Sequence, residues 1–259
     1  MSGIKKYYYL IYFQYLGFRY HGWQKQPEVK TVQLMMEKSI NYVLEHDRFK
    51  IMCASRTDSM VSANESACEI FTREPIDITL LEAGLNKNLP SDIRILRIEE
   101  TDSKFNIIKS AKQKEYVYLF AFGERSHPFA APYMTFYVEN LDLELMRQGA
   151  KLFVGEHDFT LFSKASTDKV NFVRSIDECE IIENTLFTAN FFPKKSYLLR
   201  VTGSGFIRHQ IRYMMGTLFK LGIHEISLAQ IESALKGIGE KPGYVAPASG
   251  LILNKLRFY

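Results

Sequence analysis

The segment Cys53-Ala54-Ser55-Arg56-Thr57-Asp58-Ser59-Met60-Val61 follows a short apolar run and contains a cation and a carboxylate two residues apart. Successive side chains of an extended chain alternate faces, so we expect Arg56 and Asp58 to share a face and Thr57 to turn away. A neighbouring guanidinium keeps a carboxylate ionised, and a nucleophile or general base requires an ionised, oriented carboxylate. Taken alone, this spacing favours a surface ion pair at the end of a strand.

The residues around this segment show alternating strand and helix patterns. Their order is strand, helix, strand, strand, helix, strand, which is the order of a ferredoxin-like unit. The expected elements are a strand over Tyr7–Phe13, a helix capped by Thr31 and running to about Glu45, a central strand ending at Arg56, a strand over Ser66–Thr72, a helix capped by Asp77 and running through Leu85, and a strand over Ile93–Ile98.

A second set of elements follows a long extended segment over Lys104–Phe122. We expect helices over Leu141–Val154, Gly205–Leu221 and Leu228–Leu235, and strands over Val173–Ile182, Tyr197–Thr202 and Leu251–Phe258. The predicted fold class is therefore α+β, with two ferredoxin-like (RRM-like) halves, residues 1–104 and 105–259. We expect their antiparallel sheets to join into one extended sheet with helices on one face and an active-site cleft between the halves.

Composition narrows the class of protein. The 259 residues are 46% hydrophobic and 14% aromatic, enough for a substantial core. The net charge of +4 mildly favours a polyanionic partner. Three cysteines without a CxxC spacing suggest neither a zinc site nor a disulfide framework. No secretory segment and no run of eighteen apolar residues occurs, so we expect a cytoplasmic protein without membrane contact.

A loop over residues 17–26 combines aromatic, cationic and amide side chains. Such mixtures suit RNA, because rings stack on bases and cations meet phosphates. A loop pinned to the core by Trp23 explains the same pattern, and both interpretations can hold together. The candidate RNA contacts in this loop are His21, Trp23, Gln24 and Lys25.

Arg56-Thr57-Asp58 after a short apolar strand resembles the catalytic segment of the pseudouridine synthases of the TruA family, usually glycine-Arg-Thr-Asp-x-glycine-Val-His-Ala. Other segments resemble the same family in the same order along nearly the whole chain. These are Tyr20-His21-Gly22-Trp23-Gln24 with Thr31-Val32-Gln33, Leu85-Asn86 with Leu89-Pro90-x-Asp92-Ile93, Ser110-Ala111-x-x-Lys114-x-Tyr116-x-Tyr118, Gly155-x-His157-Asp158-Phe159, Thr202 to Gly216, and Ala246-Pro247-Ala248-x-Gly250-Leu251.

The resemblance implies an activity and a set of roles. Family members isomerise uridine to pseudouridine in the anticodon stem-loop of tRNA, just 3′ of the anticodon. They use no cofactor or metal and act as homodimers, with one tRNA lying across both subunits. The resemblance makes Asp58 the nucleophile or base and Arg56 the cation beside it. Tyr116 would stack on the flipped uracil, and Arg212 would reach the catalytic Asp from the second half. Periodicity alone would instead make Tyr116 a core residue and Arg212 part of a solvated helix flank beside Arg208.

Further RNA contacts are expected along a basic groove, because cations anywhere on it can neutralise phosphates. Most surface lysines are merely solvated, so each assignment is weak by itself. Phosphate contacts are predicted at Lys25, Lys109, Lys112, Lys114, Lys169 and Arg174, and other RNA contacts at His157, Phe206 and Arg208.

This chain departs from the family pattern near the proposed site. Ser55, Met60 and Ser62 stand where glycine, glycine and histidine are usual, and Asn106-Ile107-Ile108 replaces His-Ala-Arg. An alternative function is therefore a catalytically silent RNA-binding protein that keeps the fold. A glycosidase is a weaker option, because retaining hydrolysis needs two carboxylates about 5 Å apart and the nearest acid in sequence, Glu65, has no comparable support.

Overall fold

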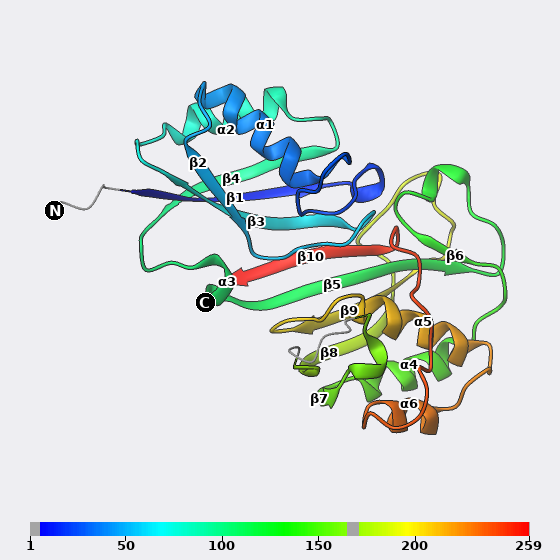
Figure 1. Ribbon diagram of the computed structural model, residues 1–259. Helices are drawn as coiled ribbons and strands as arrows, with labels where there is room; N and C mark the ends of the chain where they lie inside the picture. The colour runs from blue at the N-terminus through cyan, green and yellow to red at the C-terminus, as the bar shows by residue number, and fades with distance from the viewer. Residues whose placement is uncertain (1–5, 165–170, 259) are drawn as a thin grey trace. The chain divides into compact units, whose positions relative to one another are not determined.

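The computed structural model describes residues 6–164 and 171–258 of an α+β protein (Figure 1). Two compact units make up the chain. Unit 1 comprises Met1–Lys112 with Leu253–Tyr259, and unit 2 comprises Gln113–Ile252. The sequence placed a single boundary near residue 105, whereas the last strand, β10 (Leu251–Phe258), runs from unit 2 back into unit 1.

Unit 1 contains a sheet with the strand order β4-β1-β3-β10, in which β1 pairs antiparallel with β4 and β3, and β2 pairs antiparallel with β3. Helices α1 and α2 lie on one side of this sheet (Figure 1). The order β-α-β-β-α-β along the chain confirms the predicted order. The elements are β1 (Tyr7–Tyr15), η1 (Gly17–Arg19), α1 (Val32–Leu44), β2 (Phe49–Cys53), β3 (Ser62–Thr72), α2 (Ile78–Asn88) and β4 (Ile93–Thr101).

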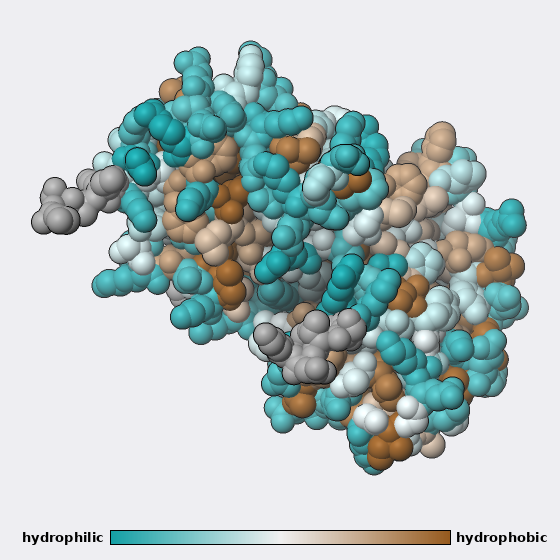
Figure 2. Space-filling model, in the orientation of Figure 1, coloured by the Kyte–Doolittle hydropathy of each residue, from teal (hydrophilic) through white to brown (hydrophobic). Residues whose placement is uncertain are grey.

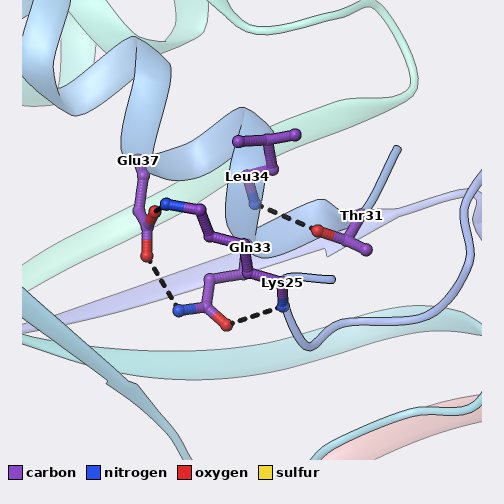
Figure 3. Close-up of polar contacts among 5 residues, drawn as sticks. All are labelled: Lys25, Thr31, Gln33, Leu34 and Glu37. Atoms are coloured by element: carbon purple, nitrogen blue, oxygen red, sulfur yellow. Dashed lines mark hydrogen bonds and ion pairs between the residues drawn. The ribbon is translucent and has the colours of Figure 1, made fainter. Parts of the chain in front are cut away.

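Both predicted helix caps of unit 1 are present. The hydroxyl of Thr31 accepts a hydrogen bond from Leu34 N at the start of α1, at 3.3 Å (Figure 3). The Asp77 carboxylate accepts one from Leu80 N at the start of α2, at 3.0 Å. Each cap satisfies a backbone N–H that has no partner within its helix. Fully buried aliphatic side chains then join helix to sheet, among them Ile11, Val32, Met36, Ile40, Ile70 and Leu85.

The strand before the Arg56 segment differs from the prediction in two respects. Among the described residues β2 pairs with β3 alone, so it is an edge strand rather than a central one. It also ends at Cys53 instead of Arg56. Just after Cys53, Ala54 N donates to Ala67 O of β3, at 3.0 Å. Three residues further on, the Thr57 carbonyl accepts its hydrogen bond from Trp23 N of another loop, so the chain leaves the sheet between Ala54 and Thr57.

The segment over residues 104–122, predicted to be extended throughout, contains a short helix. Helix α3 (Ile107–Ser110) begins after Asn106, whose side chain accepts hydrogen bonds from Ile108 N and Lys109 N, at 3.1 and 3.0 Å. Asn is a favoured capping residue, and this local bonding competes with strand pairing. Strand β5 (Ala111–Phe122) follows.

Unit 2 contains an antiparallel sheet in the order β5-β9-β8-β7, with β6 parallel to β5. Helix α5 supplies much of its core through Met214, Met215, Leu218 and Phe219, all fully buried. The elements after β5 are η2 (Pro128–Ala130), β6 (Thr135–Tyr137), α4 (Leu143–Leu152), β7 (Gly155–Asp158), η3 (Thr160–Phe162), β8 (Val173–Glu183), β9 (Tyr197–Gly203), α5 (Gln210–Gly222) and α6 (Leu228–Ala234).

Helix α5 begins at Gln210, five residues after the predicted start at Gly205. His209 has a left-handed backbone, with φ of 65°, and this conformation cannot continue a right-handed helix. Arg208 therefore precedes the helix, and the prediction that it shares a helix flank with Arg212 is wrong.

Among the described residues of unit 1, Glu69 has a buried carboxyl group. Glu69 lies on β3 and is 1% exposed. Its Oε2 accepts a long hydrogen bond from Ile107 N, at 3.4 Å, and Oε1 has no partner among the described residues. Burial raises the pKa of Glu69, and the bond from Ile107 N opposes this effect. Desolvation disfavours the ionised form, so the folded state holds the proton more tightly than the unfolded chain.

This raised pKa predicts a pH-dependent stability. The stabilisation is fully present below the ordinary pKa of 4.5 and is lost as pH rises through the raised folded value. Glu69→Gln should therefore raise the free energy of unfolding at pH 7.5 and have a smaller effect at pH 4.5. Urea unfolding at both pH values checks this, and an equal effect at the two would contradict it.

Candidate active site

The Arg56 segment forms a loop in unit 1 that is fixed through Thr57. The Thr57 hydroxyl and the Tyr15 hydroxyl lie 2.7 Å apart in a buried hydrogen bond. The Thr57 carbonyl accepts a second hydrogen bond from Trp23 N, at 3.2 Å. With Thr57 held inward, Arg56 is exposed and Asp58 is half-buried. Burial therefore alternates between Thr57 and its two neighbours.

The 17–26 loop lies directly against this segment. Gly22 has φ of 85°, and a side chain there would place Cβ 2.6 Å from the Thr57 carbonyl oxygen. Only glycine permits so close an approach in this conformation. From the other side, Met60 N and the Ser59 hydroxyl both donate to the Tyr20 carbonyl, at 3.0 and 3.3 Å. The two loops therefore form one hydrogen-bonded layer.

Trp23 fixes the 17–26 loop to the core. Its side chain is 3% exposed, and its ring lies 5.2 Å from the Phe13 ring, centroid to centroid. The structure thus shows the pinned loop that the sequence left as one possibility. The predicted RNA contact by Trp23 lacks an accessible ring surface, because burial in the core leaves almost none. His21, Gln24 and Lys25 are exposed.

Arg56 is linked to the same loop. Its Nη1 donates a hydrogen bond to Gln24 Oε1, at 3.2 Å. The sequence predicted the guanidinium beside Asp58, whereas the hydrogen-bond partner that the structure gives it is Gln24. Asp58 itself opens a tight turn, because Val61 N donates to its carbonyl oxygen at 3.2 Å.

The residues that depart from the family pattern have definite places in this turn. Met60 has φ of 66°, a left-handed conformation that glycine adopts without steric cost and methionine does not. Ser62 is buried, and its hydroxyl accepts a hydrogen bond from Gly17 N at 2.9 Å. The serine therefore joins the turn to the start of the 17–26 loop, where a longer side chain would have to leave that position.

Asp92 anchors the same loop near its start. Tyr20 OH donates to Asp92 Oδ1 at 2.6 Å, and Arg19 Nη2 lies 2.7 Å from Asp92 Oδ2. Burial and the Asp92 carboxylate raise the pKa of Tyr20, so the hydroxyl stays a neutral donor. Sequence reasoning assigned no role to Tyr15, Tyr20 or Asp92 in supporting the site. These residues lie more than 40 positions from their partners, and no local pattern marks such pairs.

Unit 2 carries the other two predicted catalytic residues. Tyr116 lies on β5, is 8% exposed, and meets the ring of Phe206 edge-on with centroids 5.4 Å apart. Arg212 lies on α5 and donates from Nε to the Ala246 carbonyl at 2.7 Å. The structure thus brings Tyr116 and Phe206 together and links Arg212 to the loop before β10.

The predicted RNA contacts of unit 2 fall on several elements. His157 on β7 and Arg174 on β8 are directly opposite in the strand pairing and so share one face of the sheet. Each also bonds a backbone carbonyl, His157 Nε2 that of Val154 and Arg174 Nη1 that of Val173. Lys114 on β5 is half-buried, and Arg208 before α5 is exposed.

Three predicted contacts remain. Lys109 and Lys112, which belong to unit 1, are exposed. Lys169 lies outside the described residues.

The described residues contain neither a cluster of metal ligands nor a membrane-spanning helix. Among residues 6–164 and 171–258, no three His, Cys, Asp or Glu side chains cluster as metal ligands would. Within that same part of the chain, no helix is long and apolar enough to span a bilayer. None of the three cysteines, all of which lie in the described part of the chain, forms a disulfide.

Comparison with known proteins gives a consistent result. A family model described as tRNA pseudouridine synthase matches residues 11–108 and 150–259. A tRNA pseudouridine synthase A of Thermodesulfovibrio yellowstonii is 30% identical over 247 residues, covering 94% of this chain and 96% of the relative. Proteins of the same name from Clostridium kluyveri and Mesoplasma florum are 30% and 31% identical, covering 95% and 96% of this chain and 97% and 98% of their own lengths.

The left-handed backbone of Met60 predicts that glycine at this position stabilises the fold relative to methionine, and that valine destabilises it. Met60→Gly should raise the free energy of unfolding by up to about 1 kcal/mol, because the strain of the turn is relieved. Met60→Val should lower it by about 1 kcal/mol, because a β-branched side chain fits this conformation worse than methionine. Met52→Gly, in extended strand β2, is the matched control and should be destabilising. Urea unfolding of the three variants measures the order, and a destabilising Met60→Gly would contradict it.

Proposed function

The chain belongs to the tRNA pseudouridine synthase family, and on this premise we propose that it isomerises uridine to pseudouridine in tRNA. The proposed target is the anticodon stem-loop, just 3′ of the anticodon, and Asp58 is the proposed catalytic carboxylate. The observation that carries the proposal is the fixed Thr57, whose two hydrogen bonds hold the loop in which the next residue, the half-buried Asp58, opens a tight turn.

The proposed reaction needs no co-reactant. The bond between N1 of uracil and C1′ of ribose breaks, the uracil turns, and C5 bonds to C1′. C5 loses a proton and N1 gains one, so the product is an isomer of the substrate. A held carboxylate can serve this sequence either as a nucleophile at C1′ or as the base that removes the C5 proton. Asp58 is proposed for one of these two roles.

The other catalytic roles are proposed from the family resemblance. Arg56 is proposed as the cation beside the carboxylate, and its bond to Gln24 supports a defined orientation of the guanidinium. Tyr116 is proposed to stack on the extruded uracil, and its edge-on contact with Phe206 supports a fixed ring. Arg212 is proposed to reach the catalytic carboxylate, and its bond to Ala246 supports a fixed side chain.

The remaining elements of the proposal concern partners and architecture. We propose tRNA as the partner, bound across two copies of the chain in the cytoplasm. The phosphate and base contacts are His21, Gln24, Lys25, Lys109, Lys114, His157, Arg174, Phe206 and Arg208. The two halves are proposed to be ferredoxin-like, which the β-α-β-β-α-β order of unit 1 supports. No metal or cofactor enters the proposed mechanism.

The silent RNA-binding alternative rests on the replaced residues of the turn. Met60 and Ser62 differ from the usual glycine and histidine, yet both fit the observed turn, and Ser62 contributes a buried hydrogen bond. The replacement of His-Ala-Arg by Asn106-Ile107-Ile108 removes two polar or cationic groups from a segment that the family presents to RNA. These changes bear more on the choice of RNA than on the carboxylate.

Asp58→Asn tests the proposed activity directly. With tRNA tritiated at C5 of uridine, the wild-type protein should release tritium and the variant should do so at least about 10⁴-fold more slowly. Its affinity for tRNA should stay within a few-fold, because the substitution keeps the shape of the side chain. Glu100→Gln, the same acid-to-amide change at an exposed position on β4, is the control and should keep full activity.

The results separate the two functions. A wild-type protein that binds tRNA without releasing tritium would favour the silent alternative. Full tritium release by Asp58→Asn would remove this carboxylate from the mechanism. Mapping the pseudouridines of the product by mass spectrometry then locates the target, and unmodified anticodon arms would exclude the proposed site.

A further inference from the structure

A groove of about 1200 Å³ lies in unit 1 beside β2, the edge strand of the sheet. Helix α1 and the end of β3 complete its walls, and Lys25 of the 17–26 loop lies on its rim. Figure 2 shows hydrophobic surface over β2 and β3 bordered by hydrophilic groups. Among the residues that line this groove, Lys25 alone has a part in the proposed function, as a phosphate contact.

The charge of the groove is strongly unbalanced. Its lining includes two carboxylates, Glu37 and Asp47. The cations exceed them by four, which equals the net charge of the entire chain of 259 residues. A cleft lined by one sign of charge focuses the electrostatic field and concentrates ligands of opposite sign. The cations are Lys6, Lys25, Lys38, Arg48, Lys50 and Arg73.

Existing ion pairs leave most of this positive charge uncompensated. Glu37 receives Lys25 Nζ at 2.7 Å and Gln33 Nε2 at 2.8 Å (Figure 3), so its oxygens are already engaged. Lys38, Lys50 and Arg73 are exposed, and in the described part of the chain no carboxylate lies within ion-pair distance of them. These cations are available to an anionic ligand.

The walls of the groove also offer apolar surface. Phe49, Ile51 and Phe71 line it and are half-buried, so part of each side chain remains accessible. A simple phosphate site would not need such surface. Rings beside cations are instead typical of sites for looped or single-stranded nucleic acid, where bases stack while phosphates meet the charges.

The groove is continuous with the candidate site within unit 1. Strand β2 lines the groove and leads directly into the loop that carries Arg56 and Asp58. Lys25 on the rim follows Gln24, the hydrogen-bond partner of Arg56. A nucleic acid strand held at Asp58 could therefore extend along β2, a length of about 17 Å for five extended residues.

We propose that this groove binds the sugar-phosphate backbone of the substrate tRNA outside the reacting nucleotide. The inference rests on the proposed function and extends it, because it adds a binding surface that the reaction itself does not require. Lys38 on α1 and Lys50 on β2 contact phosphates in this proposal, and the half-buried rings contact bases or riboses.

The test replaces both lysines and leaves the catalytic loop intact. Lys38→Gln with Lys50→Gln should weaken binding of unmodified tRNA about tenfold near physiological salt, because each lost phosphate contact removes a share of the counterion release. The slope of log Kd against log salt should fall by about 1.5. Lys87→Gln with Arg94→Gln removes the same charge from exposed positions of unit 1 outside the groove and should change neither quantity.

The readouts distinguish failure of this inference from failure of the proposed function. Tritium release at saturating tRNA should be unchanged in the groove variant, while KM rises. Equal affinity and salt slope in the groove and control variants would overturn the inference, whether or not wild-type protein releases tritium. That result would also be expected if an acidic protein rather than RNA occupied the groove. Circular dichroism and urea unfolding of each variant verify that the fold is intact.

Discussion

The proposed chemistry depends on one buried hydrogen bond, between the hydroxyls of Thr57 and Tyr15. A polar group taken out of water must find a partner, and the cost of losing that partner is a few kcal/mol. Thr57 therefore has one favourable orientation, inward toward β1. On either side of it, Arg56 is exposed and Asp58 is half-buried. The proposed catalytic carboxylate thus lies in a loop that is held by a residue without a role in the proposed reaction.

The close contact between the two loops of unit 1 makes that orientation rigid. Gly22 lets the 17–26 loop approach the Thr57 carbonyl, and Trp23 fixes the same loop to the core. Met60 holds the turn after Asp58 in a conformation that usually requires glycine. Strain of this kind persists only where the surrounding structure over-determines the backbone. Here the turn is held by the hydrogen bond from Met60 N to the Tyr20 carbonyl and by the bond from Gly17 N to the Ser62 hydroxyl. The replaced residues are therefore compatible with a fixed turn.

Electrostatics acts locally in this protein. A net charge of +4 over the whole chain says little about its partners. In unit 1, however, the groove beside β2 is lined by four more cations than carboxylates, an excess equal to the net charge of the whole chain. Salt screens exposed charges over about 10 Å, so a cluster within that distance acts together while scattered charges do not. Affinity for a polyanion therefore depends on where the cations lie, which composition cannot report.

The sequence by itself determined the features that depend on neighbouring residues. The order of strands and helices, the caps at Thr31 and Asp77, and the buried faces of the helices all follow from local patterns, as does the family resemblance. Tertiary structure alone decided which strand lies at an edge, as for β2, where α5 begins after His209, and whether Trp23 faces RNA or the core. Tertiary structure also decided the hydrogen-bond partners of Thr57 and Tyr20. Each of these depends on contacts between residues far apart in the chain, and such contacts leave no periodic signal in the sequence.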